Sequence, residues 1–241
     1  MKTIQPRLEA LPSSQRNLWP LLRAVGHDFA LYGGTALSLQ LGGRQSVDFD
    51  FFTPNLIDPE ILAKSLPFLR HATLIQRAHA TASFSLNCPE PVKVSFFGAL
   101  DFGRVDEPRQ FSDNGVVAAG LLDLAAQKVK VVQQRAETKD YIDICTLLDN
   151  GVTLEKALGA AQCLYPEFNP LVTLKALTFF NDGDLRTLPG SLQRRLVGAV
   201  SQVREIQLVE KMSNSLLATT IAPAAPVQRP QQPPPEMNIG M

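Results

Sequence analysis

Two aspartates one residue apart carry the most specific chemical signal in the sequence. Asp48 and Asp50 lie in the stretch VDFDFF, where they alternate with Phe49 and Phe51. Successive side chains of a β-strand point to opposite faces, so both carboxylates share one face of a predicted strand over Val47–Phe52. Two carboxylates on one face provide the oxygen ligands that suit Mg²⁺, and such an ion can bridge to the phosphates of a nucleoside triphosphate (NTP). The sequence therefore predicts Asp48 and Asp50 as metal ligands and catalytic residues.

A predicted phosphate-binding turn precedes this strand. Gly33 and Gly34 end a short predicted strand, and Thr35 is placed to cap the helix that follows. Glycine lets the backbone approach a ligand closely, and the free N–H groups of a helix N-terminus attract phosphate. Between this helix and the aspartates, the Arg44 guanidinium can hold a phosphate bidentately, and the Ser46 hydroxyl can donate a further hydrogen bond. These five residues form the predicted nucleotide-binding set.

Plainer structural roles are the alternatives at these positions. A glycine pair alone is more often a tight turn than a phosphate loop, and alternating aspartates often mark an exposed strand face. The combination favours a site, because phenylalanines flank Asp48 and Asp50 directly after a second glycine turn at Gly42 and Gly43. The D-x-D sites of haloacid dehalogenases and glycosyltransferases are disfavoured, since no apolar run precedes Asp48.

Two stretches of the chain together resemble a known enzyme family. The stretch GGTALSLQLGGRQSVDFDFF, over residues 33–52, resembles the first motif of the AbiEii/AbiGii toxin family of nucleotidyltransferases, within the DNA polymerase β-like superfamily. The stretch LLDLAAQKVKVVQQRAETKDYIDICTLL, over residues 121–148, resembles the later motif of that family, a helix with a lysine and an arginine followed by K/R-D-x-x-D. The resemblance covers residues 28–150, and the joint occurrence of both motifs makes it specific.

The resemblance implies further site residues and substrates. It places Lys128, Asp140 and Asp143 in the catalytic set and adds Arg135 as a weaker nucleotide-binding candidate. It also implies Mg²⁺ as cofactor, an NTP as substrate, an RNA (tRNA) or protein as acceptor, and a toxin role beside a cognate antitoxin. A solvated basic stripe is the alternative for Lys128 and Arg135, which share one helix face. A favourable charge near a helix N-terminus is the alternative for Asp140, and a surface pair with Lys139 is the alternative for Asp143.

One position departs from the pattern of the superfamily. Many members carry a third metal-binding carboxylate on a later strand, but the predicted strand Val92–Phe97 has Ser95 at that place. Asp101 or an aspartate of the helical part is the candidate substitute. Without a third ligand a second metal would be weakly held, so the competing hypothesis is a catalytically impaired module that binds nucleotide, nucleic acid or a partner protein. Lys93, on the same strand, is predicted to be a surface lysine, with a contact to phosphate or RNA as the alternative.

Composition and charge exclude several classes of protein. The chain has 241 residues, of which 45% are hydrophobic and 19% charged, and its net charge of zero provides no global basic surface for nucleic acid. Lys2, Arg7 and Glu9 interrupt any secretory signal, and no stretch approaches the roughly 20 apolar residues of a membrane helix. Cys88 and the other two cysteines have no metal-ligand spacing and are predicted to be reduced. We therefore predict a soluble cytoplasmic protein that does not contact membranes.

Periodicity predicts an α+β fold. The expected strands are 29–32, 47–52, 73–78, 81–86 and 92–97, and the expected helices are 8–25, 35–41, 54–69, 121–135, 139–148, 154–164, 171–180 and 192–208. They predict a polymerase β-like nucleotidyltransferase α/β domain with a mixed sheet at residues 1–115, followed by a helical domain at 116–218. Six prolines and few large apolar residues predict a disordered Pro-rich tail at 219–241.

Overall fold

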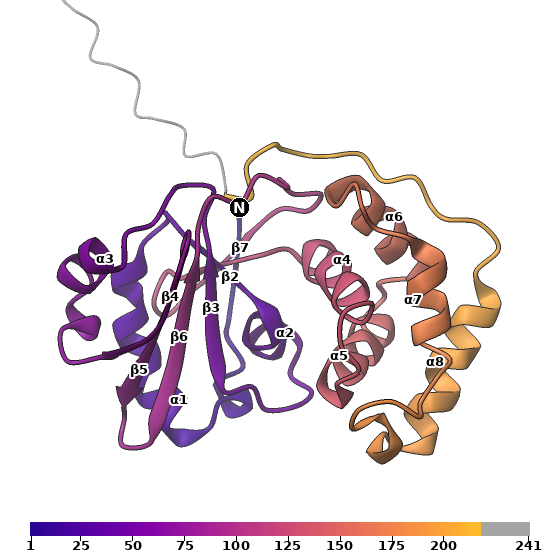
Figure 1. Cartoon of the computed structure of the whole chain (residues 1–241), viewed down its shortest axis with the longest axis horizontal. Coiled ribbons are helices and arrows are strands. Elements are labelled where there is room, and N and C mark those ends of the chain that lie inside the picture. The colour runs from indigo at the N-terminus through magenta and orange to yellow at the C-terminus, as the bar shows by residue number, and fades with distance from the viewer. Residues whose placement is uncertain (218–241) are drawn as a thin grey trace, which may run out of the picture.

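An eight-stranded mixed sheet forms the first part of the chain in the computed structural model, which describes residues 1–217 (Figure 1). The strands follow the order β1-β7-β8-β2-β3-β6-β5-β4. β3 lies inside the sheet, antiparallel to β2 and parallel to β6, so the predicted mixed α+β fold is confirmed. The bounds are β1 (Lys2–Ile4), β2 (Ala30–Tyr32), β3 (Asp48–Phe52), β4 (Thr73–Ala78), β5 (Thr81–Asn87), β6 (Pro91–Phe97), β7 (Arg109–Phe111) and β8 (Val117–Ala118).

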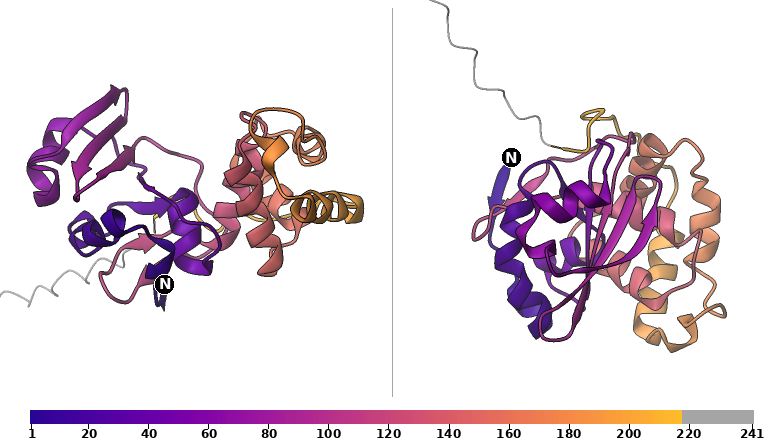
Figure 2. Two further views of the ribbon diagram at one scale, coloured as in Figure 1. Left: turned by 90° about the horizontal axis from the view of Figure 1, so that it is seen from below. Right: turned by 60° about the vertical axis from the view of Figure 1, so that its left-hand side comes forward.

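Helices flank the sheet and then form a separate layer beside it (Figures 1 and 2). In that layer α4 packs against α5 and α6, and both α4 and α5 also contact α2, which lies between the layer and the sheet. Within residues 1–217, no helix has the length and apolar character needed to cross a bilayer. The α-helices are α1 (Ser13–Leu18), α2 (Gly33–Leu41), α3 (Pro59–Ser65), α4 (Leu121–Val131), α5 (Thr138–Asp149), α6 (Leu154–Leu164), α7 (Pro170–Ala176) and α8 (Gly190–Gln202).

The placement of a domain boundary at residue 115 stays a prediction. β8 pairs with β2 and β7 inside the sheet, and α4 begins at Leu121. The short chain between β8 and α4 thus links the sheet to the helical layer. The predicted disordered tail at 219–241 lies outside the described residues.

Aromatic packing fixes which face of β3 is buried. Phe49 and Phe51 are fully buried. Phe51 stacks on Phe96 of β6 with ring centroids 5.5 Å apart, and Phe49 stacks on Trp19 at 6.2 Å. Burial of each such side chain contributes about 1.5–3 kcal/mol, and a slip of one residue would turn both rings out of this core. The intervening aspartates are therefore held on the opposite face of the strand, as the alternation predicts.

Several predicted helix ends are wrong: the predicted helices at 54–69 and 171–180 contain the shorter α3 and α7. Two further differences have a cause that is distant in sequence. α2 begins at Gly33 with Tyr32 before it, so Thr35 lies within the first turn and does not cap the helix. The Thr35 hydroxyl bonds to the chain that leads into β3 instead. α8 ends at Gln202 rather than continuing to residue 208. In both cases a contact distant in sequence overrides the local pattern.

The segment at residues 203–217 crosses back from α8 toward the sheet, as Figure 1 shows. Arg104 anchors it: its backbone N–H donates to the Ser213 carbonyl at 2.9 Å, and its guanidinium donates to the carbonyls of Ser215 and Leu217 at 3.0 and 2.7 Å. Along the way the Gln207 carbonyl oxygen takes the space that a Cβ on Gly159 of α6 would fill. A helical continuation would lose these contacts.

Three short strands escape sequence prediction. β1 and β7 have three residues each and β8 has two, which is too few for a two-residue alternation to register. β1 pairs with β7 in parallel, and β8 pairs with β2 in parallel. Their pairing is long-range and depends on the assembled sheet.

A buried carboxyl group lies where the chain passes from the sheet into α4. Asp123 is 1% exposed, and its Oδ1 accepts a hydrogen bond from the Val105 N–H at 2.8 Å. Its Oδ2 has no partner among residues 1–217. Burial, reinforced by the nearby charge of Asp106, raises the pKa of Asp123 to about 7. The folded state therefore favours the protonated acid.

The raised pKa of Asp123 predicts that the free energy of unfolding depends on pH. The pKa of Asp123 is higher in the folded than in the unfolded chain, so its contribution to the free energy of unfolding falls as pH rises from about 4 to about 7. Asp123→Asn keeps an oxygen acceptor for Val105 and removes the titration. We expect the variant to gain on the order of 2–4 kcal/mol over wild type between pH 5 and pH 8, measured by urea unfolding. A constant difference across this range would contradict the prediction.

Candidate active site

The two aspartates of β3 face an open cleft. Asp48 and Asp50 are half-buried, whereas the phenylalanines between and after them are in the core or against it. The parallel register places Asp48 beside Lys93 and Asp50 beside Ser95 on β6. Paired residues of adjacent strands project from the same face, so this face carries both carboxylates, a lysine and a hydroxyl.

The N-terminus of α2 lies directly against this face. Gly33 has a φ of +71°, and a Cβ built on it would lie 2.9 Å from Asp50 Oδ2. Its N–H donates to the Gln127 side-chain carbonyl at 3.3 Å. A larger residue would therefore be strained in its backbone and would push the aspartate aside. Gly33 is required for the close approach of the helix to Asp50, in agreement with its predicted place in the site.

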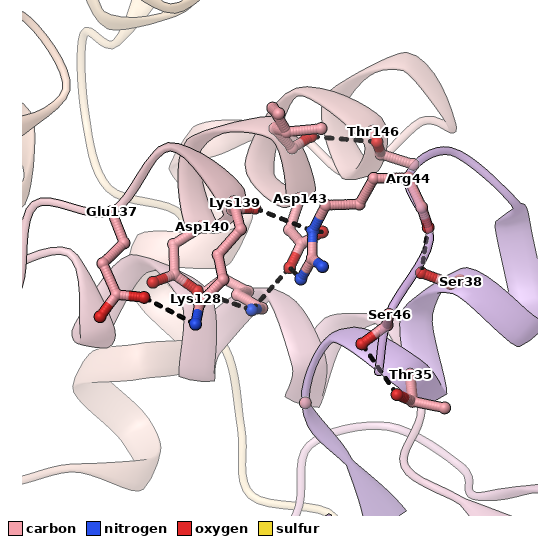
Figure 3. Close-up of polar contacts among 12 residues, drawn as sticks. Thr35, Ser38, Arg44, Ser46, Lys128, Glu137, Lys139, Asp140, Asp143 and Thr146 are labelled. Atoms are coloured by element: carbon pink, nitrogen blue, oxygen red, sulfur yellow. Dashed lines mark hydrogen bonds and ion pairs between the residues drawn. The ribbon is translucent and has the colours of Figure 1, made fainter. Parts of the chain in front are cut away.

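Hydroxyl groups hold the chain between α2 and β3. Thr35 Oγ1 lies 2.8 Å from Ser46 Oγ (Figure 3). It also contacts the Asp48 backbone carbonyl. Ser38 Oγ donates to the Arg44 carbonyl at 2.8 Å. These bonds fix the position of Ser46 and the start of β3. Ser46 therefore lines the cleft, and Thr35 holds it in position from behind.

An ion-pair network runs along one wall of the cleft, and Figure 3 labels most of its residues. Glu137 belongs to it, with Oε1 3.6 Å from Arg135 Nε and Oε2 2.7 Å from Lys139 Nζ. Arg44 donates from Nε and Nη2 to the two oxygens of Asp143, at 2.8 Å each. Lys128 Nζ lies 2.6 Å from Asp143 Oδ2 and 2.8 Å from Asp140 Oδ1. Arg135 Nε donates to Asp140 Oδ2 at 2.8 Å. The network joins the chain after α2 to α4 and α5.

The geometry separates the predicted catalytic aspartates into two kinds. Asp140 and Asp143 are at most 1% exposed, and both are occupied by cations. Burial would raise the pKa of Asp140, but hydrogen bonds from Arg135 and Lys128 and their charges outweigh burial and hold that pKa below its usual value. These carboxylates position the cations, whereas Asp48 and Asp50 face the open space.

The cleft itself encloses about 380 Å³ between the sheet and α4. Five cationic residues line it, against the two aspartates of β3, so the space attracts a polyanion. The cations come from three separate parts of the chain. The lining residues are Gly33, Gly34, Arg44, Ser46, Val47, Asp48, Asp50, Phe52, Lys93, Phe97, Gln127, Lys128, Val131, Gln134, Arg135 and Lys139.

Most of the predicted nucleotide-binding residues line this cleft. Gly34 and Arg44 lie in contact, because a Cβ on Gly34 would fall 2.3 Å from Arg44 Nη2. Ser46 and Arg135 also line the cleft, whereas Thr35 does not. The structure thus brings the two sequence motifs to the same space.

Several cleft residues were not predicted from sequence. Lys93 is exposed, as predicted for a surface lysine, but it also lines the cleft, and in residues 1–217 its Nζ has no carboxylate within 4.0 Å. The signal was its place two residues before Ser95, hence on the same strand face. Gln127 lies on α4, and Gln134 lies in the chain after it. Neither carries such a signal, since a glutamine on or near a helix is usually a solvated residue.

The structure describes no third carboxylate beside Asp48 and Asp50. Ser95, paired with Asp50, is fully buried, and it accepts a hydrogen bond from Ser83 Oγ at 3.1 Å. Asp101 does not line the cleft. No group of three or more potential metal-binding side chains occurs within residues 1–217. Asp48 and Asp50 are thus the carboxylates available to a metal in this cleft.

The pKa of Asp50 reflects this arrangement of charges. Burial raises its pKa, and the adjacent charge of Asp48 raises it further, while Lys93 and Lys128 lower it. Two close carboxylates repel each other unless a cation lies between them. The donor set therefore fits a hard divalent cation that prefers oxygen ligands.

Comparison with known proteins agrees with this geometry. Residues 21–205 match the model of the family described as nucleotidyl transferase AbiEii toxin, of a type IV toxin-antitoxin system. The chain belongs to this family. The resemblance stated from the two sequence motifs is confirmed, and the protein is a member of a nucleotidyltransferase family.

Individual relatives of this AbiEii-family chain are distant. An uncharacterized protein, aq_aa25, from Aquifex aeolicus strain VF5 is 28% identical over 180 residues, which are 73% of this chain and 85% of the relative. MenT4, a nucleotidyltransferase toxin from Mycobacterium tuberculosis H37Rv, is 13% identical with a TM-score of 0.54 over 79% of this chain and 82% of MenT4. An antigenic nucleotidyltransferase-like protein from Paracoccidioides brasiliensis is 17% identical with a TM-score of 0.44, over 80% and 92% of the two chains. The likeness to MenT4 shows the fold.

The ion-pair network leads to a prediction about stability. Asp140→Asn leaves Lys128 with one of its two carboxylates, and loss of one partner of a buried pair costs about 3–5 kcal/mol. Asp149→Asn is the matched control on the same helix, because Asp149 pairs with the exposed Arg195 and should cost under about 1 kcal/mol. Urea unfolding of both variants measures the difference. Equal losses would show that the buried network does not stabilise the fold.

Proposed function

We propose that the cleft transfers a nucleoside monophosphate from an NTP to an acceptor hydroxyl, with Mg²⁺ as cofactor. One observation carries the proposal: the two carboxylates of β3 face the same cleft as the N-terminus of α2, which approaches Asp50, and Lys128 of α4. The acceptor oxygen attacks the α-phosphorus, the bond to the β-phosphate breaks, pyrophosphate leaves and the hydroxyl proton is released. Such chemistry needs positioning and charge neutralisation rather than many reactive groups.

The triphosphate would lie between the glycine pair and the cations. Gly34 lies in the first turn of α2, where helix N–H groups attract phosphate, whereas the N–H of Gly33 itself donates to the Gln127 side chain. Ser46 donates a hydrogen bond, and Lys128 faces the phosphates with its ammonium held in place by Asp140 and Asp143. In this role the two buried aspartates are positioning residues. They fix the cations before the substrate arrives, which lowers the cost of binding.

Asp48 and Asp50 would hold the Mg²⁺. When bound there, the ion neutralises the phosphate oxygens and orients them for in-line displacement. Lys93 lies beside Asp48 on the same face and brings a positive charge into the cleft. We propose that this lysine stabilises the charge that develops on the reacting phosphate. Asp48 and Asp50 then suffice without a third carboxylate.

The acceptor and the biological role follow from the family and the charge of the cleft. We propose RNA, tRNA first, as the acceptor, because the cations at the rim attract a phosphate backbone. A protein hydroxyl is the second candidate. The family description, a type IV toxin-antitoxin system, supports a toxin role beside a cognate antitoxin.

A binding module without catalysis is the competing function. Ser95 at the place of the third carboxylate is the observation that favours it. Such a module would bind NTP in the same cleft, since the glycine pair and the cations remain. Transfer of label from an NTP separates the two functions.

The principal prediction concerns Asp48. The purified protein is incubated with Mg²⁺, each α-³²P-labelled NTP in turn and total bacterial RNA, and label on RNA and on protein is measured. Wild type should transfer label from at least one NTP, and Asp48→Ala should lose at least about 100-fold of that rate, the scale of losing a key electrostatic contact.

Asp101→Asn is the matched control. Asp101 is an exposed aspartate outside the cleft, so its replacement should leave the rate unchanged. Full activity of Asp48→Ala would refute the assignment of the metal ligand. No labelled product with wild type and any NTP would favour the binding module.

Two glycine variants test the close approach of α2 to Asp50. Gly33→Ala should lower the transfer rate by up to about 100-fold, because a new Cβ would lie 2.9 Å from Asp50 Oδ2 and push that carboxylate out of position. Gly26→Ala is the control: its φ is +66°, close to the +71° of Gly33, but a Cβ there meets nothing within 4 Å. Both variants should lose similar stability by thermal unfolding. Equal transfer rates would mean that this contact does not position the reacting groups.

A further inference from the structure

A second hollow opens beside the cleft, at the end of α4. It encloses about 410 Å³ and lies between the chain after α4, the start of α5, and α7 with the chain that follows it. Gln134 and Arg135 line both the hollow and the cleft, so the two spaces are neighbours. A substrate held at Asp48 and Asp50 can therefore extend into the hollow past Gln134.

Hydrogen bonds hold the floor of the hollow together. Gln133 donates from Nε2 to the Asn169 carbonyl and to Thr173 Oγ1, both at 2.8 Å. Tyr141, which is 1% exposed, donates its hydroxyl proton to the Ala176 carbonyl at 3.1 Å. These bonds tie α5 and α7 to the chain after α4. The hollow is thus a formed surface rather than a gap between loosely packed helices.

The rim of the hollow offers groups that have no partner in the described chain. Phe179 is a large aromatic residue that is 50% exposed, and Val172 beside it is 42% exposed. Within residues 1–217, the Gln134 amide makes no hydrogen bond and Lys175 makes no ion pair. Asp182 supplies a carboxylate on the same rim.

We infer that this hollow is a nucleoside-binding subsite that takes an unpaired base of a substrate, an inference that rests on the proposed transfer reaction. An unpaired base stacks on an exposed aromatic ring, and the Phe179 ring provides one. The Gln134 amide has a donor and an acceptor for the edge of the base, and the Asp182 carboxylate accepts from an exocyclic amino group. Lys175 is placed for the adjoining phosphate.

Two sources can supply such a base. It belongs either to the NTP that donates the nucleotide or to the unpaired end of the RNA that accepts it. Both enter the cleft at Asp48 and Asp50, and both carry the same planar group. The chemistry of the hollow is the same in each case, so experiment must assign the source.

Photo-crosslinking of the full-length protein tests the subsite. The donor probes are 5-iodouridine triphosphate and 8-azidoadenosine triphosphate with Mg²⁺, and the acceptor probe is an oligouridylate that ends in 5-iodouridine. After irradiation, mass spectrometry locates the adduct. We expect it on the peptide that contains Phe179, from the triphosphates if the donor base lies there and from the oligonucleotide if the acceptor base does.

Variants of the rim supply a second readout. Phe179→Ala should raise the KM of the substrate assigned by crosslinking roughly 5- to 150-fold, the range that stacking of one base on an aromatic ring supplies. Phe179→Tyr keeps an aromatic ring and should therefore have the KM of the wild type. Leu171→Ala is the matched control, since Leu171 is 65% exposed on α7 but does not line the hollow.

The outcomes separate this inference from the proposed function. Absence of an adduct at Phe179 from every probe, with an unchanged KM in Phe179→Ala for each NTP and for RNA, overturns the subsite while transfer stands. Adducts at Phe179 with a wild-type protein that transfers no label overturn the proposed reaction and leave the subsite standing.

Discussion

A buried lysine held between two buried aspartates is the constraint on which the candidate site depends. Lys128 comes from α4, and its partners Asp140 and Asp143 come from α5. Asp143 also holds Arg44, which arrives from the chain between α2 and β3. A buried charge is tolerated only with its partners in place, so the network fixes the helical layer relative to the sheet. The network sets four cations, the last of them Arg135 and Lys139, against three carboxylates that include Glu137, so one positive charge is left over beside the cleft.

A second constraint on the geometry of the cleft comes from the packing of the sheet. The rings of Phe49 and Phe51 are buried, which forces Asp48 and Asp50 outward, and Gly33 lets the N-terminus of α2 approach Asp50. The N-terminus of α2 and the carboxylates of β3 thus lie on one side of the cleft, while the helical layer provides cations that ion pairs hold in place. Each part comes from a different region of the chain.

Sequence reasoning was strongest where the chemistry is local. The alternation over β3 predicts which carboxylates face the cleft, and the two motifs predict the family. It was weakest where contacts are long-range: β1, β7 and β8 are too short to predict, and Lys93 enters the cleft only through its register with Asp48. Likewise, Asp140 and Asp143 are buried against cations that are separated in the sequence. These groups come together only when α2, α4 and α5 pack.

In the proposed function, the cleft binds an NTP with a divalent cation between the two aspartates of β3. The most direct measurement is a crystal structure of the protein with Mn²⁺ and an NTP that cannot be cleaved between its α- and β-phosphates, with the anomalous signal of manganese recorded. We expect one anomalous peak between Asp48 and Asp50, with the triphosphate against Gly33 and Lys128. A triphosphate bound elsewhere, or manganese held away from these carboxylates, would contradict the account.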